Sequence, residues 1–158
     1  MIRTERGNIW DHHTSHHIVI PTNIGYKRKG GANVMGRGLA AQAAKRFPDL
    51  PRWYGEYCRT FGKDTPVVVY PEARLILFPV KPLNEAAPWM SWKAEADLGL
   101  IKRAAKQLAH VHVGPVAVSL VGCGNGGLDM DDVRPILDRH LSDKRFTLVL
   151  WGTDGRQS

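Results

Sequence analysis

Apolar residues follow two patterns along this chain, and the two patterns alternate. Short, continuous, β-branched or leucine-rich runs are typical of strands covered on both faces, and they predict strands at 18–20, 66–70, 74–79, 115–121 and 146–151. Apolar residues spaced three and four apart predict helices over 39–47, 50–58, 93–110 and 130–141. A weak alternation over 2–6 adds an edge strand. This order predicts a layered α/β domain with helices on both faces of a mixed sheet.

Two glycine-rich loops, 30–40 and 121–129, stand where an apolar run gives way to a helical pattern. Their glycines present backbone N–H groups without obstructing side chains, and the start of a helix favours an anion. Asp129 is a natural N-cap for the second of these helices. Neither loop has the Walker or the G-x-G-x-x-G spacing. Two such loops indicate a ligand with two phosphates, or with a phosphate and a sugar.

The strand predicted over 74–79 continues into Lys81, which therefore faces any site at that edge of the sheet. Ligands of layered α/β folds bind beyond the carboxyl ends of strands, where both glycine loops and Lys81 fall. The stretch 83–92 is predicted to be a loop, and its Trp89 and Trp92 are available to wall a pocket.

Two polar segments each have two interpretations. The basic segment 25–31, which follows the strand ending at Asn23, is either a mobile, charged lip over the site or a solvated loop. Four histidines within 11–17 invite a zinc site, since imidazole is the commonest zinc ligand. No cysteine or spaced acidic residue completes a ligand set, so a polar loop between two strands is favoured and no metal is expected.

Composition places the chain among globular proteins of one domain. It has 158 residues, of which 43% are hydrophobic and 23% charged. Cys58 and Cys123 stand far apart, which favours a reducing compartment over a disulfide scaffold. No apolar run approaches a membrane span and no signal-peptide pattern begins the chain, so we expect a cytoplasmic protein. The net charge of +7 favours anionic partners, although charge alone is better explained by a solvated basic surface.

Taken together, these motifs resemble the macro domains, a family that binds ADP-ribose. The resemblance covers nearly the whole chain, from Gly7-Asn8-Ile9 through Asn23 to both glycine loops. The run 34–40, followed by Lys45-Arg46-Phe47-Pro48, resembles the branch that contains the DarG-type antitoxins, which remove ADP-ribose from DNA bases. Phe78-Pro79-Val80-Lys81 is similar to that branch's Phe-Pro-Thr-Lys motif, whose lysine is catalytic. The resemblance implies a three-layer α/β/α macro domain with a mixed central sheet over residues 1–158.

The resemblance also implies a site. Lys81 would stand near the anomeric carbon of the distal ribose and Asn23 would hold a hydroxyl of that ribose, which makes these two the candidate catalytic residues. Asn8 replaces the usual acidic partner of the adenine amino group, and its side-chain carbonyl can accept the same bond. The residues implied to contact the ligand are Asn8, Ile9, Thr22, Asn33, Val34, Met35, Gly36, Gly38, Gly122, Gly124, Asn125, Gly126, Gly127, Leu128 and Trp151.

The implied activity is a hydrolase that removes ADP-ribose from a modified macromolecule, and the basic charge favours nucleic acid. A partly desolvated lysine loses its proton more readily and can attack the sugar or assist its opening; alternatively, Lys81 is an electrostatic clamp on phosphate. Two other functions stay open: a non-catalytic ADP-ribose reader, and a hydrolase of small derivatives such as the 1″-phosphate or O-acetyl-ADP-ribose. No cofactor is implied. An ADP-ribosyltransferase toxin is an implied partner, and a membrane is not.

Overall fold

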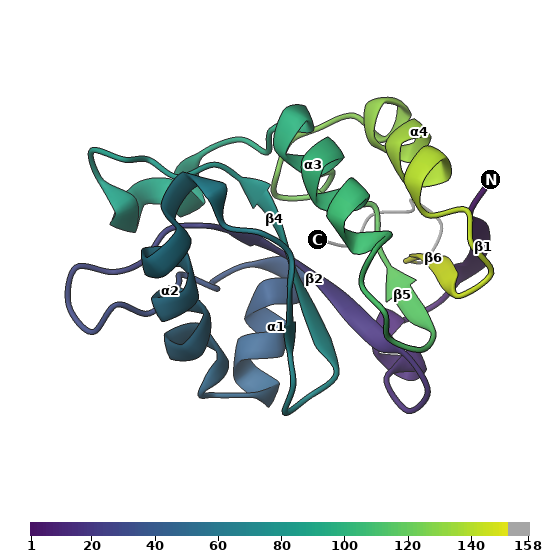
Figure 1. The fold of residues 1–158 in the computed structure, drawn as a ribbon, viewed down its shortest axis with the longest axis horizontal. Helices are drawn as coiled ribbons and strands as arrows, with labels where there is room; N and C mark the ends of the chain where they lie inside the picture. The colour runs from purple at the N-terminus through teal and green to yellow at the C-terminus, as the bar shows by residue number, and fades with distance from the viewer. Residues whose placement is uncertain (152–158) are drawn as a thin grey trace.

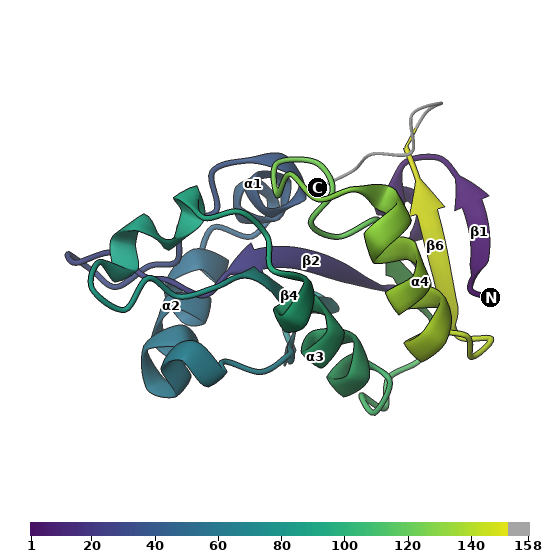
Figure 2. The same cartoon turned by 90° about the horizontal axis from the view of Figure 1, so that it is seen from above.

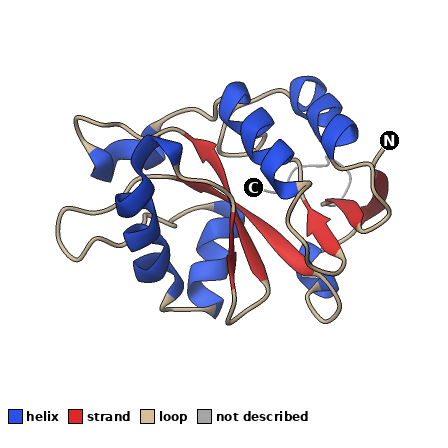
Figure 3. Cartoon of the chain, in the orientation of Figure 1, coloured by secondary structure: helices blue, strands red, loops and turns tan. Residues whose placement is uncertain are grey.

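The computed structural model describes residues 1–151, and a six-stranded sheet forms its centre (Figures 1 and 3). The strands lie in the order β1-β6-β5-β2-β4-β3. Their bounds are β1 Arg3–Arg6, β2 His17–Asn23, β3 Val68–Tyr70, β4 Leu75–Lys81, β5 Val116–Val118 and β6 Phe146–Leu150. All neighbouring strands are parallel except β3, which is antiparallel to β4. The mixed sheet expected from the sequence is therefore confirmed, with β1 at its edge.

Helices cover both faces of this sheet, as Figures 1 and 2 show. Within residues 1–151, the α-helices are α1 Gly38–Arg46, α2 Leu50–Phe61, α3 Leu98–Leu108 and α4 Met130–His140. Successive side chains of a strand point to opposite faces, so β2 contributes to two cores. Ile18 and Ile20 pack in the cluster beneath α1 and α2, whereas Val19 packs in the cluster beneath α3 and α4. All three are fully buried, which is why this run is continuously apolar.

Several elements differ from their predicted bounds. The helix predicted from 93 begins at Leu98, because Asp97 caps it by accepting a hydrogen bond from the Leu100 N–H at 2.9 Å. Part of the predicted loop 83–92 forms a 3-10 helix, η3, over Pro88–Lys93. The strand predicted over 115–121 stops at Val118, since the chain turns there and the Val121 N–H bonds to the Ser119 carbonyl. The predicted polar tail, 152–158, lies outside the described residues.

The histidine segment contacts neighbouring elements through its side chains. A second 3-10 helix, η1, spans Ile9–His12. The Nε2 atom of His12 lies 2.9 Å from Glu5 on β1, and that of His13 lies 2.6 Å from the carbonyl of Ala73. Within residues 1–151, no three His, Cys, Asp or Glu side chains are grouped so as to hold a metal ion. In the same range, no helix has both the length and the apolar character that a membrane span needs.

Candidate functional site

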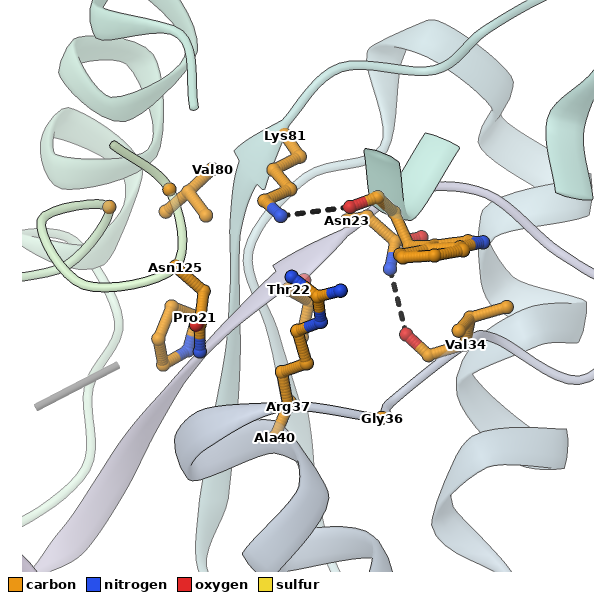
Figure 4. Close-up of a pocket in the computed structure, with 13 residues that line it drawn as sticks. Pro21, Thr22, Asn23, Val34, Gly36, Arg37, Ala40, Val80, Lys81 and Asn125 are labelled. Atoms are coloured by element: carbon orange, nitrogen blue, oxygen red, sulfur yellow. Dashed lines mark hydrogen bonds between the residues drawn. The ribbon is translucent and has the colours of Figure 1, made fainter. Parts of the chain in front are cut away.

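A cavity of about 290 Å³ opens at the carboxyl ends of β2 and β4 and beside the loop that follows β5 (Figure 4). Because these strands are parallel, their ends meet at one edge of the sheet. Several residues named from the sequence line this cavity, namely Thr22, Asn23, Val34, Gly36, Lys81, Gly122, Asn125 and Gly126. The lining also includes Pro21, Arg37, Ala40 and Val80, which sequence reasoning missed, and Trp92, which it expected in a pocket wall.

Lys81, the last residue of β4, points its amine into this cavity. Its Nζ donates a hydrogen bond to the carbonyl oxygen of Trp92 at 2.8 Å. Burial, and secondarily the positive charge of Arg37, lower the pKa of Lys81 from its ordinary value. Both causes disfavour the charged ammonium. At a given pH, a larger fraction of Lys81 is therefore the neutral amine than for an exposed lysine, and the neutral amine can act as a nucleophile or a base.

Arg37 lies just before α1 and lines the same cavity as Lys81 (Figure 4). Its guanidinium carbon lies 5.4 Å from the centre of the Trp92 ring, so one tryptophan contacts Arg37 through its ring and Lys81 through its carbonyl. Arg37 occupies the N-cap position of α1 but makes no capping hydrogen bond with its side chain. The first-turn N–H groups of α1 consequently remain without a side-chain cap beside Gly36 and Ala40, an arrangement that favours an anion.

We expect Arg37→Met to raise the pKa of Lys81 toward its ordinary value, because the substitution removes a neighbouring positive charge. Burial of Lys81 remains in the variant, so the pKa stays below that of an exposed lysine. NMR titration of the lysine side chains measures this, with the Lys81 signal assigned by its loss in Lys81→Ala. Arg103→Met, on the exposed side of α3, is the matched control. An unchanged Lys81 titration in Arg37→Met would contradict the assigned electrostatic contact.

Asn23 and Asn33 hold the first glycine loop against the end of β2. Asn23 donates from Nδ2 to the Val34 carbonyl at 2.8 Å and accepts at Oδ1 from the Gly25 N–H at 2.9 Å. The buried Asn33 donates from Nδ2 to the carbonyls of Asn23 and Gly25, at 3.0 and 2.8 Å. Asn23 therefore faces the cavity and also shapes its wall, whereas Asn33 supports the wall from outside the lining.

The second glycine loop is compact and has little room for side chains. A Cβ on Gly126 would overlap the carbonyl oxygen of Gly122, and Gly122 itself has a φ of +79°. The Leu128 N–H closes the loop on the Gly122 carbonyl at 3.0 Å, and the Ala96 N–H bonds to the Gly126 carbonyl at 3.0 Å. These contacts fix the backbone of the loop where it borders the cavity.

The remaining predicted residues lie outside the cavity lining. Asn8 caps η1, because its side-chain carbonyl accepts from the Trp10 N–H at 3.0 Å. Asn8 and the half-exposed Trp151 follow β1 and β6, which end at the same edge of the sheet as the cavity. Ile9 and Met35 belong to the core beneath α1 and α2, and Leu128 packs against the other core. The other residues outside the lining are Gly38, Gly124 and Gly127.

Comparison with known sequences and structures gives three findings. No family model matches the chain. The DNA ADP-ribosyl glycohydrolases of Mycobacterium bovis and Mycobacterium tuberculosis are each 34% identical to it over 112 aligned residues, and each match covers 63% of this chain and 29% of that protein. The chain thus spans less than a third of the length of the curated relatives it matches.

Solved structures share the fold along nearly the whole chain. The macrodomain of Mycobacterium tuberculosis DarG has a TM-score of 0.68 and 26% identity, covering 94% of this chain and 97% of that one. The macrodomain of Thermus aquaticus DarG has a TM-score of 0.71 and 24% identity, covering 96% and 98%. Thermosipho africanus DarTG in complex with ADP-ribose has a TM-score of 0.73 and 19% identity, covering 98% and 43%. The three-layer α/β/α fold expected from the sequence is therefore confirmed.

Proposed function

We propose that residues 1–158, as a single macrodomain similar to those of DarG, remove ADP-ribose from a modified nucleic acid. The observation that carries this proposal is the position of Lys81, whose amine faces a cavity bordered by two glycine loops and has a lowered pKa. The DNA ADP-ribosyl glycohydrolase activity of the curated relatives supports the reaction type. The net charge of +7 supports a polyanionic substrate.

ADP-ribose is proposed to lie along the carboxyl edge of the sheet. Its diphosphate would lie between the N-terminus of α1 and the loop containing Gly126, where backbone N–H groups and a helix dipole favour negative charge. The distal ribose would then reach Lys81 and Asn23 at the ends of β4 and β2. The adenine would extend toward the ends of β6 and β1, where Asn8 lies.

In the proposed reaction, the neutral amine of Lys81 attacks the anomeric carbon of the distal ribose. The bond from that carbon to the nucleobase breaks, and the base leaves with the bonding electrons and takes up the proton that the newly bonded lysine nitrogen loses. Water then displaces the lysine from the sugar, which releases ADP-ribose and restores the amine. The carbonyl of Trp92 orients the amine before attack, through the hydrogen bond at 2.8 Å.

Two alternatives use the same cavity. A non-catalytic reader needs the glycine loops but gains nothing from a lysine whose pKa is lowered. A hydrolase of small derivatives needs Lys81 but no affinity for a polyanion. The proposed partner is a toxin that attaches the ADP-ribose, since removal presupposes attachment. The proposed location is the cytoplasm, because nucleic acid is found there.

Salt dependence distinguishes a nucleic-acid substrate from a small one. We expect the affinity for an ADP-ribosylated oligonucleotide to fall steeply and linearly on a plot of log affinity against log salt, because bound phosphates release counterions. The affinity for free ADP-ribose should fall much less, since it contributes only two phosphates. Titration by fluorescence anisotropy and by calorimetry at several salt concentrations measures the affinities for the oligonucleotide and for free ADP-ribose. Equal slopes for the two ligands would favour the small-derivative hydrolase.

A further inference from the structure

Beside the cavity, two segments gather positive and aromatic side chains that the proposed reaction does not use. We call this surface the cationic rim and define it as Lys27, Arg28, Lys29, Trp89 and Lys93. The first three lie in the loop after β2 and the last two lie in η3. The guanidinium carbon of Arg28 lies 3.7 Å from the centre of the Trp89 ring, so the two segments touch. All four cationic residues are exposed.

The base of this loop is packed rather than free. The Gly25 carbonyl accepts from Asn33 at 2.8 Å, and the Lys27 N–H bonds to the Ala32 carbonyl at 2.8 Å. A Cβ on Gly25 would overlap the Pro88 carbonyl, so the loop lies directly against η3. These contacts hold the base of segment 25–31 in place. They present an exposed, charged tip on a supported base.

The cationic rim is continuous with the reacting end of the cavity. Trp92 lines the cavity, accepts the hydrogen bond from Lys81, and lies in the same helix, η3, as Trp89 and Lys93. The glycine loop at 122–126, which contains Asn125, lines the same cavity as Lys81 and Val80 (Figure 4). If the diphosphate occupies the glycine loops, the group attached to the anomeric carbon must leave the cavity past η3.

The charges of the rim are available to a ligand. Among residues 1–151, the salt bridges join His12 to Glu5 and Arg145 to Asp143, and neither involves the rim. In the segment 83–96, which contains Trp89 and Lys93, the acidic residues are Glu85 and Glu95. The four cations of the rim outnumber these two carboxylates. Phosphates bind such cations with release of counterions, and the guanidinium plane of Arg28, which lies over the partly buried ring of Trp89, can stack on a nucleobase.

We propose that the cationic rim binds the nucleic-acid strand on either side of the modified nucleotide. Lys27, Lys29 and Lys93 contact its phosphates, and Trp89 with Arg28 stacks on a neighbouring base. This inference rests on the proposed function, because the strand leaves the cavity at the rim only if its ADP-ribose occupies the cavity. It adds an affinity for the strand that an isolated ADP-ribosylated nucleoside does not have.

The test is charge reversal of the loop tip, Lys27→Glu with Arg28→Glu and Lys29→Glu. We expect kcat/KM for an ADP-ribosylated oligonucleotide to fall at least about tenfold, while kcat/KM for the ADP-ribosylated nucleoside changes less than about twofold. The salt slope of oligonucleotide binding should also decrease by about two, since Lys27 and Lys29 each lose one phosphate contact and each lost contact lowers the slope by about one. Lys102→Glu with Arg103→Glu and Lys106→Glu makes the same charge change on the exposed side of α3 and is the control.

Equal losses on the oligonucleotide and the nucleoside would overturn the rim proposal, as would an equal loss in the α3 control. Binding of the ADP-ribosylated oligonucleotide, followed by anisotropy, tests the rim separately from hydrolysis. If the unaltered chain binds that oligonucleotide more tightly than free ADP-ribose but releases nothing, the proposed reaction fails and the rim stands. If the loop variant keeps the full oligonucleotide affinity, the rim fails whatever the reaction.

Discussion

Replacing Lys81 with alanine is expected to slow the release of ADP-ribose from a modified oligonucleotide at least about a hundredfold, the scale of losing a positioned proton-transfer group or nucleophile. Affinity for free ADP-ribose should stay within about threefold, because the glycine loops supply most of the proposed phosphate contacts. Single-turnover kinetics and calorimetry measure the two quantities. Lys102→Ala, an exposed lysine of α3, is the matched control and should behave as the unaltered chain.

Lys81→Arg separates the two chemical roles of this residue. Arginine keeps the positive charge and can donate to the Trp92 carbonyl, but it does not lose its proton in proteins. If Lys81 attacks the sugar, the arginine variant should be about as slow as the alanine variant. Substantial activity in Lys81→Arg would indicate an electrostatic clamp, and full activity in Lys81→Ala would exclude any role of Lys81 in the reaction.

Gly36→Glu is expected to weaken ADP-ribose binding by about a hundredfold or more. A Cβ at Gly36 meets no protein atom within 4 Å, so the folded chain accepts a side chain there. The new carboxylate would stand in the cavity lining at the start of α1, against the proposed diphosphate. Like charges held together cost several kcal/mol, and each 1.4 kcal/mol is about tenfold in affinity. Calorimetry with free ADP-ribose measures the loss.

A substitution at Gly36 tests whether the diphosphate lies against the backbone more clearly than a substitution in the loop after β5 does. Any side chain on Gly126 would overlap the Gly122 carbonyl and deform the loop, so weaker binding by a Gly126 variant has two explanations. Gly114→Glu, at an exposed glycine where a Cβ also meets nothing within 4 Å, is the control and should bind ADP-ribose normally. Unchanged affinity in Gly36→Glu would show that the diphosphate does not lie against α1.

Much of the fold is predictable because the apolar pattern reports burial directly. The run Ile18-Val19-Ile20 is apolar throughout because the sheet is covered on both faces. The start of α3 was predicted five residues early, because an apolar stripe does not mark the capping residue, here Asp97. The 3-10 helix over Pro88–Lys93 is too short for a periodic pattern to reveal.

The candidate site was less predictable from sequence, because spacing identifies segments but not side-chain partners. The glycine loops indicate contacts through their backbone, and this pattern assigns no role to the side chain of Arg37 between Gly36 and Gly38. The sequence does contain one signal for a role of Arg37, because it is the only cation that stands between two glycines at the start of a helix. Likewise, nothing in the sequence shows that Asn8 caps η1 or that Asn33 bonds to two backbone carbonyls.

The most direct test of the account is single-turnover release of ADP-ribose from an oligonucleotide that carries it on one thymidine base, with the enzyme in excess. We expect this chain to release free ADP-ribose and to restore the unmodified strand. If calorimetry shows that the chain binds ADP-ribose while the modified strand remains intact, the proposed activity on DNA is contradicted.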